Sequence, residues 1–191
     1  MDVILAAKTY AARAVALPDA KRPLLALATG VTDGRRLLLA LRTTTPQALW
    51  AGAFSPPVGL SPVPSFGEAE TFGEGVDIDR LTDSTFGEYH RGLDYQVPAG
   101  TPVLAPAPGN VVFAGTLTLT GETLVLDHGQ GVVSAFFHLG RIDVHEGDRV
   151  EARAAIALSG DTGIAPSPHL HWGVYVHGVA VDPGVFEKLK D

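Results

Sequence analysis

Short apolar segments separated by turn residues fill the chain after Tyr89. None shows a helical period, and clusters such as Pro98-Ala99-Gly100 and Glu146-Gly147-Asp148 lie between them. The segments are LDYQV, TPVLAPA, NVVFAGTLTL, TLVLDHG, VVSAFFHL, RVEARAAIALSG and HLHWGVYVHGVAVD. This pattern of short apolar segments and turns predicts an all-β fold of mostly antiparallel strands, either a sheet, a sandwich or a partly open barrel.

The first 54 residues have a different pattern. Residues 6–17 predict a short helix or an extended arm, which Pro18 and Asp19 end. Three short apolar segments follow at 23–29, 36–43 and 48–54, with the turn signal Thr32-Asp33-Gly34 between the first two. They predict a small antiparallel β unit.

A proline-rich stretch separates the two patterns. The sequence SPPVGLSPVPS at 55–65 holds four prolines and predicts an extended connector. From there to Gly87 the chain is rich in Gly, Glu, Asp and Thr, which predicts a surface loop. The predicted organisation is a small N-terminal β-rich module (1–54), a connector and loop (55–87) and a β-rich domain (88–191).

Composition narrows the possible functions. The chain is 46% apolar and 18% charged, which is typical of a globular protein, and its net charge of −7 comes without a basic stripe. Nucleic acid is therefore not expected as a partner. Without cysteine, any metal must be held by histidine and carboxylate. No run of about 18 apolar residues predicts a membrane span, and the N-terminus lacks the pattern of a signal peptide.

The candidate chemistry lies in two short motifs of the β-rich half. In HRGLD, His90 and Asp94 are four positions apart, so an extended segment presents both on one side. In HLHW, His169 and His171 are two apart, and a strand directs both to the same face. His138, in FFHLG, is a fifth candidate.

Zinc is the metal that suits these residues. Zinc enzymes hold the ion with three protein ligands and keep a fourth position for water. His90, Asp94 and one histidine of HLH would form such a set, and the other histidine would handle protons or bind an oxyanion. The alternative is a group of structural histidines that bond to backbone carbonyls in a β core. We expect His128, His145 and His177, which lie in turns, at the surface.

The order of these motifs resembles that of the LytM/lysostaphin-type zinc metallopeptidases, the M23 peptidase family, over residues 88 to 184. The resemblance implies a zinc endopeptidase that cuts peptides of bacterial cell-wall peptidoglycan, at the cell envelope or outside the cell, on a mostly antiparallel β fold with an open groove. It places the metal ligands on His90, Asp94 and His171. It places two catalytic histidines on His138 and His169, without assigning the base and the oxyanion stabiliser between them.

Two departures from the family pattern bear on substrate choice and rate more than on the ligands. Glu70 stands where an arginine is common and reverses a charge near the groove, and Phe136 stands in place of a tyrosine and lacks its hydroxyl. A third departure, Ser167-Pro168 in place of Gly-Pro, is a change of turn that the fold is expected to tolerate. A cell-wall binding or regulatory module of the same family is the main alternative. Biotinyl or lipoyl carriers and phosphotransfer domains share the β-rich texture, but the carriers need a lysine in a tight hairpin and phosphotransfer does not need HxxxD.

Overall fold

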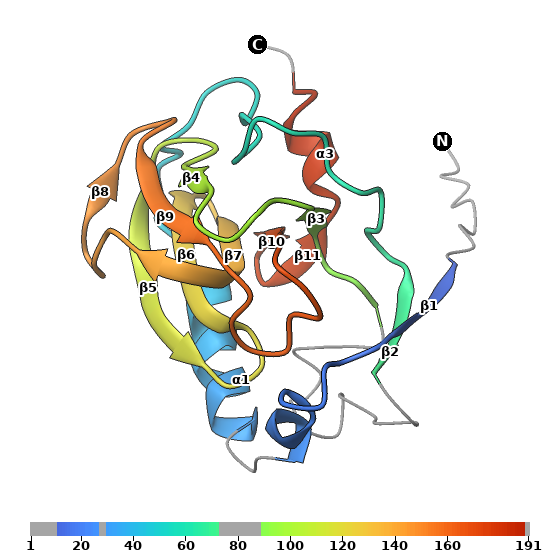
Figure 1. The fold of residues 1–191 in the computed structure, drawn as a ribbon. Helices are drawn as coiled ribbons and strands as arrows, with labels where there is room; N and C mark the ends of the chain where they lie inside the picture. Colours follow the sequence, from blue (N-terminus) through green and yellow to red (C-terminus); the bar gives the residue numbers. More distant parts are fainter. Residues whose placement is uncertain (1–10, 27–29, 73–88, 190–191) are drawn as a thin grey trace, which may run out of the picture.

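The computed structural model describes residues 11–26, 30–72 and 89–189, and its main element is a nine-stranded antiparallel sheet. The strands run in the order β11-β10-β7-β6-β5-β8, with β3 beside β10, β9 beside β7 and β4 beside β9 (Figure 1). Their bounds are β3 Leu93–Tyr95, β4 Pro102–Leu104, β5 Gly109–Leu117, β6 Gly121–Gly129, β7 Val132–Ile142, β8 Arg149–Val150, β9 Ala155–Ser159, β10 Leu170–Val176 and β11 Val179–Val181. The predicted mostly antiparallel β fold is confirmed.

Tight turns connect the long strands. Between β10 and β11, His177 and Gly178 have φ values of 51° and 80°, so both residues of the two-residue turn are in the left-handed region. A hairpin turn of this kind matches the right-handed twist of the strands that it joins. The segment Gly129-Gln130-Gly131 does the same between β6 and β7, with three positive φ values.

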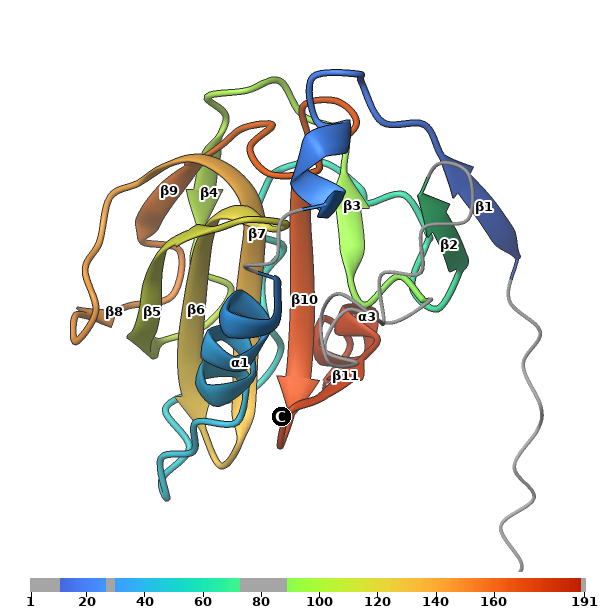
Figure 2. The same ribbon diagram turned by 90° about the horizontal axis from the view of Figure 1, so that it is seen from below.

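Both faces of the central strands are covered. In β6, Leu124 and Leu126 belong to one buried cluster with Phe136 and Trp172, whereas Val125 belongs to a second cluster on the other side. Side chains alternate between the faces of a strand, so a sheet that is covered on both sides needs a nearly continuous apolar strand, as β6 has. The second face lies under the helix α1 (Gly30–Leu41), as Figure 2 shows.

The predicted antiparallel unit at 23–54 is wrong. Residues Arg22–Ala26 form a 3-10 helix, α1 is an α-helix, and 48–54 form neither helix nor strand. The reason is the period of the buried positions: Leu37, Ala40 and Leu41 are buried at i, i+3 and i+4, while Leu39 is exposed. A short apolar run does not distinguish a strand from a helix by itself. The supposed turn residue Asp33 lies in the first turn of the helix, where a carboxylate is favourable.

The N-terminal arm forms a second, small sheet. Strand β1 (Ala12–Val15) pairs in parallel with β2 (Ala69–Phe72), so the extended form predicted within 6–17 is confirmed at 12–15, and residues 6–10 lie outside the described part. The proline-rich connector has no helix or strand, as predicted. Most of the predicted surface loop, residues 73–87, lies outside the described part. In its described start the prediction is wrong, because Ala69–Phe72 form β2 by pairing with the distant strand β1. A short helix, α3 (Pro183–Phe186), follows β11.

Two further predictions concern the chain as a whole. In the described segments, no helix has the length and apolar character needed to cross a membrane. The division into 1–54, 55–87 and 88–191 stays a prediction. Phe54 and Val58, on either side of the first boundary, both lie in the core cluster that contains Trp172.

Candidate metal centre and active site

Three side chains from two neighbouring strands meet at one end of the main sheet. His171 in β10 is the register partner of Asp94 in β3, and His90 lies three residues before β3. Antiparallel pairing places side chains of partner residues next to each other. The atoms His90 Nε2, Asp94 Oδ1 and His171 Nδ1 are each 3.0 Å from the other two, and all three side chains are buried. The structure thus brings together the two motifs of the sequence.

Gly92 is required by the close approach of these strands. A Cβ atom at this position would lie 2.5 Å from the carbonyl oxygen of Trp172 and 2.6 Å from Nε2 of His171. Such distances are shorter than van der Waals contact, so any side chain would push β3 away from β10 or turn the His171 ring. The glycine in HRGLD therefore lets His171 approach the segment between His90 and Asp94.

The three close contacts fit a bound cation better than a hydrogen-bond network. A carboxylate oxygen only accepts hydrogen bonds, and each imidazole nitrogen either donates or accepts. In any protonation state, at least one of the three contacts would bring together two N–H groups or two lone pairs. A tetrahedral zinc ion with bonds of about 2.0–2.1 Å separates its ligand atoms by roughly 3.3 Å, close to the distances seen here. Two imidazoles and a carboxylate are donors that zinc prefers.

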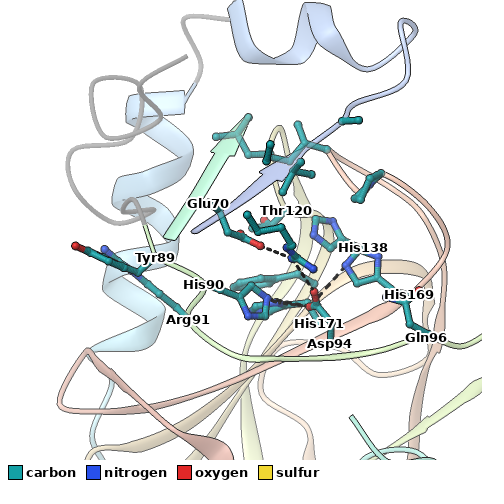
Figure 3. Close-up of a pocket in the computed structure, with 18 of the residues that line it drawn as sticks. Glu70, Tyr89, His90, Arg91, Asp94, Gln96, Thr120, His138, His169 and His171 are labelled. Atoms are coloured by element: carbon teal, nitrogen blue, oxygen red, sulfur yellow. Dashed lines mark hydrogen bonds and ion pairs between the residues drawn. The ribbon is translucent and has the colours of Figure 1, made fainter. Parts of the chain in front are cut away.

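A second pair of histidines lies beside this group and is bonded differently. His138 in β7 directs Nδ1 to the carbonyl oxygen of Thr162 at 2.9 Å, and His169 directs Nδ1 to that of Ser167 at 2.8 Å. Because a carbonyl only accepts, Nδ1 carries the proton in both rings and Nε2 has a free lone pair when the ring is neutral. The ring centroids are 4.9 Å apart, and His169 Nε2 lies 3.8 Å from Asp94 Oδ1 (Figure 3).

The backbone at His138 is unusual for a non-glycine residue, with φ of 61°. The pairing of β7 with β6 shifts register across this residue, and the pairing with β9 shifts just after it, between Leu139 and Arg141. The N–H of His138 donates to the carbonyl of Thr120. A bulge of this kind redirects a side chain out of the strand's regular alternation. It allows His138 to face the site although it lies in a central strand.

Burial and the local contacts set the charge of these groups. Burial alone would raise the pKa of Asp94, but its hydrogen bonds with His171 and His90 outweigh this and hold the pKa well below its usual range. Burial lowers the pKa of His138 well below that of a free histidine, and it also lowers the pKa of His171. At neutral pH the site therefore combines a carboxylate anion with a neutral, proton-accepting His138.

A cleft of about 290 Å³ opens over these side chains. Figure 3 shows that the N-terminal arm and β2 form one wall of it, with Glu70 on the side of the histidines. Arg13 of the arm also lines the cleft. Arg13 forms ion pairs with Glu70 and, at 3.6 Å, with Asp94 Oδ2. The negative charge that Glu70 brings to the groove is thus balanced by an arginine that sequence reasoning missed, because no motif links residues 13 and 70.

The remaining predictions have mixed outcomes. Phe136 is fully buried in the core and does not line the cleft. His145 and His177 are exposed, as predicted. The surface position predicted for His128 is wrong: it is fully buried, Nδ1 donates to the carbonyl of Pro108, and Nε2 accepts from Ser134. The reason is that β6 continues to residue 129 and the chain around residue 49 pairs with it and covers it.

Comparison with known proteins identifies the family. The model of peptidase family M23 matches residues 88–183. The chain belongs to this family. An "Uncharacterized metalloprotease" of Haemophilus influenzae is 41% identical over 95 residues, and "Peptidoglycan DD-endopeptidase ShyA" of Vibrio cholerae is 37% identical over 93 residues. Each alignment covers 49% of this chain, and 20% and 22% of the two relatives.

A solved structure shares the fold of this M23 peptidase chain beyond the matched region. The crystal structure of "a zinc containing peptidase" from Vibrio cholerae superposes with a TM-score of 0.59 and 27% sequence identity, over 72% of this chain and 40% of that one. The chain spans about a fifth of the length of the two curated relatives.

Proposed function

We propose that the chain is a zinc-dependent endopeptidase that hydrolyses peptide bonds in bacterial cell-wall peptidoglycan. The observation that carries this proposal is the triangle of His90, Asp94 and His171 next to two imidazoles whose Nε2 atoms are free to accept a proton. The chain's place in the M23 family supports the same chemistry.

In this proposal, His90 Nε2, Asp94 Oδ1 and His171 Nδ1 hold the zinc ion. When bound, zinc acts as a Lewis acid that polarises the scissile carbonyl and makes water more acidic. The ionised Asp94 leaves the site with one negative charge to offset the charge of the cation. Phe137 stacks on the His171 ring at a centroid distance of 5.0 Å with planes only 4° apart, which restricts rotation of that ligand.

His138 and His169 are the catalytic residues of the proposal. Their shared tautomer leaves Nε2 as a proton acceptor, so either ring can take a proton from the attacking water. The imidazolium formed has N–H groups at both nitrogens. It can hydrogen-bond to the oxyanion and later return the proton to the departing amine. The sequence contains no HExxH motif, so the glutamate base of that other class of zinc protease has no counterpart here.

The lining of the cleft suits a peptide substrate. The cleft is open to solvent and is lined by both apolar and polar side chains, including Val15, Ile164, Tyr89 and Gln96. This mixture suits a peptide better than a nucleic acid or a purely apolar ligand. The relative ShyA is named for its action on peptidoglycan. A peptidoglycan substrate would place the protein at the cell envelope or outside the cell.

A digestion assay tests the proposal. The protein is incubated with purified peptidoglycan, with and without a zinc chelator, and the soluble muropeptides are identified by mass spectrometry. We expect cross-linked dimers to be converted to monomers, the chelator to stop this, and added zinc to restore it. Zinc-independent release, or no release by a zinc-loaded protein, would overturn the proposal. Sedimentation with peptidoglycan without cleavage would instead support the alternative of a binding or regulatory module.

A further inference from the structure

The N-terminal arm is joined to the metal centre by a continuous set of backbone hydrogen bonds. Strand β2 pairs with β1 on one side and with residues 89–90 on the other, where the N–H of His90 donates to the carbonyl of Glu68 and the N–H of Gly67 donates to that of His90. The arm therefore extends the backbone that carries the proposed ligand His90. Its side chains have a defined position relative to the metal centre.

Arg13 is the residue of the arm that reaches this centre. In the parallel register of β1 and β2, Arg13 is the partner of Glu70, and the two side chains form an ion pair. The same Nη2 atom lies 3.6 Å from Asp94 Oδ2, and Nε lies 4.0 Å from a carboxylate oxygen of Glu68. The Glu70 and Asp94 side chains are 11% and 7% exposed, whereas the Arg13 side chain is 39% exposed, so the acidic ends of these contacts are buried and the arginine is partly open to water.

The two oxygens of Asp94 thus face different partners. Oδ1 faces His90 and His171, whereas Oδ2 faces the guanidinium of Arg13. A carboxylate without a partner at its second oxygen can rotate, and it can also approach a metal with both oxygens. Groups that bond to the outer side of a ligand are known to fix its orientation.

Glu70 makes an arginine tolerable at this place. An unpaired guanidinium so close to a cation site would repel the metal. Paired with Glu70, it adds no net charge to the surroundings of Asp94. The pair can therefore orient the carboxylate without weakening the site by charge alone.

From these contacts we infer that Arg13 is a positioning residue of the metal centre, held by Glu70, which keeps Asp94 with Oδ1 directed at His90 and His171. The inference rests on the proposed function, since it assigns Asp94 as a zinc ligand. The N-terminal arm then contributes a side chain that positions a metal ligand.

Two double variants test this inference at constant net charge. Arg13→Gln with Glu70→Gln removes the ion pair, whereas Arg13→Glu with Glu70→Arg keeps the pair but moves the arginine to β2. The matched control is Arg22→Gln with Asp19→Asn, which removes a fully separate ion pair of 3.2 Å whose side chains are 68% and 96% exposed. Zinc affinity is measured by competition with a chromophoric chelator, and thermal unfolding checks the fold.

We expect the Gln/Gln variant to bind zinc about 10- to 100-fold more weakly, as is typical when an outer partner of a ligand is lost. The exchanged pair should stay within about fivefold of the wild type, and the control within about twofold. At saturating zinc, we expect the fold decrease in kcat of the Gln/Gln variant to be larger than the fold increase in its KM. If it fails to fold, Arg13→Lys, which keeps the charge but not the planar fork, should still bind zinc several-fold more weakly.

Zinc affinity and kcat unchanged in both Gln/Gln and Lys variants would overturn the inference. So would a gain in turnover with unchanged affinity, because it would make the arm an obstruction of the cleft. Failure of the proposed function is distinguishable from these results: in that case the wild-type protein itself would bind no zinc or cleave no peptidoglycan.

Discussion

The cleft holds two pairs of histidines that differ only in what surrounds them. His90 and His171 each place a ring nitrogen 3.0 Å from the Asp94 carboxylate, whereas His138 and His169 each donate Nδ1–H to a backbone carbonyl. The first arrangement points lone pairs at a common centre. The second fixes a tautomer and leaves a proton acceptor free. The chemistry of each histidine thus depends on the partner of one of its ring nitrogens, which is the Asp94 carboxylate in the first pair and a backbone carbonyl in the second.

The largest effect is expected from the first pair. His90→Ala or His171→Ala removes one of the three proposed ligands and leaves only one imidazole and the Asp94 carboxylate to hold the ion. We expect zinc content to fall from about one per chain to near zero, and hydrolysis to fall by about 10³-fold or more. Metal analysis by mass spectrometry together with muropeptide release measures both. Full zinc content in either variant would contradict the assignment of His90 and His171 as metal ligands.

The second pair should give a large effect of another kind. His138→Ala and His169→Ala should retain about one zinc per chain and lose about 10²- to 10⁴-fold in kcat, the usual contribution of acid–base groups. The same two assays apply, with kcat obtained at saturating substrate. If either variant loses its zinc, that histidine is a metal ligand, which contradicts the division of the four histidines into ligands and catalytic residues.

His128 allows a third comparison with these pairs, because it is buried and its Nδ1 donates to a carbonyl, as in His138 and His169, but it lies outside the cleft. Burial lowers its pKa to about 4, below the unfolded value of about 6.5. The unfolded chain therefore binds the proton first as the pH falls, and the native state loses stability from about pH 6.5 down through pH 4. The loss from this group amounts to about 3 kcal/mol.

His128→Gln provides the measurement. Urea unfolding at pH 7 and pH 4 should show a fall in stability that is smaller in the variant than in the wild type by about that amount. Zinc content and kcat of the folded variant should be unchanged. Equal falls in both proteins would mean that His128 is not held neutral in the fold.

The smallest effect is expected from an exposed histidine. The side chain of His145 is 91% exposed and its contact with Asp148 is 3.7 Å long. His145→Ala should change zinc content, kcat and the free energy of unfolding by less than the error of each assay, about 0.5 kcal/mol for stability. A clear loss of activity would contradict the assignment of His145 to the surface outside the site.

The sequence predicted the parts of this molecule that depend on local pattern. Short apolar segments and turn residues predicted the antiparallel sheet, and the spacing within HRGLD and HLHW predicted side chains that the structure brings together. The helix α1 was not predicted because its short apolar run is compatible with both the strand period and the helix period. Only its packing against the sheet shows which positions are buried. Arg13 was missed because only the pairing of β1 with β2 brings it to Asp94.

Two further features, one in the site and one outside it, could not be predicted from the local sequence for the same reason. The tautomers of His138 and His169 depend on carbonyls of Thr162 and Ser167, and the position of Thr162 relative to residue 138 is a property of the fold. The burial of His128 depends on residues around position 49, where the N–H of Leu49 donates to the carbonyl of His128. Long-range contacts of this kind leave no trace in a local pattern.

An anomalous difference map of zinc-loaded crystals, recorded at the zinc absorption edge, tests the central claim most directly. We expect one strong peak, about 2.0–2.2 Å from His90 Nε2, Asp94 Oδ1 and His171 Nδ1 and clearly farther from His138 and His169. A peak bonded to His138 or His169, or no peak within reach of the three ligand atoms, would contradict the division of the histidines on which the proposed hydrolase depends.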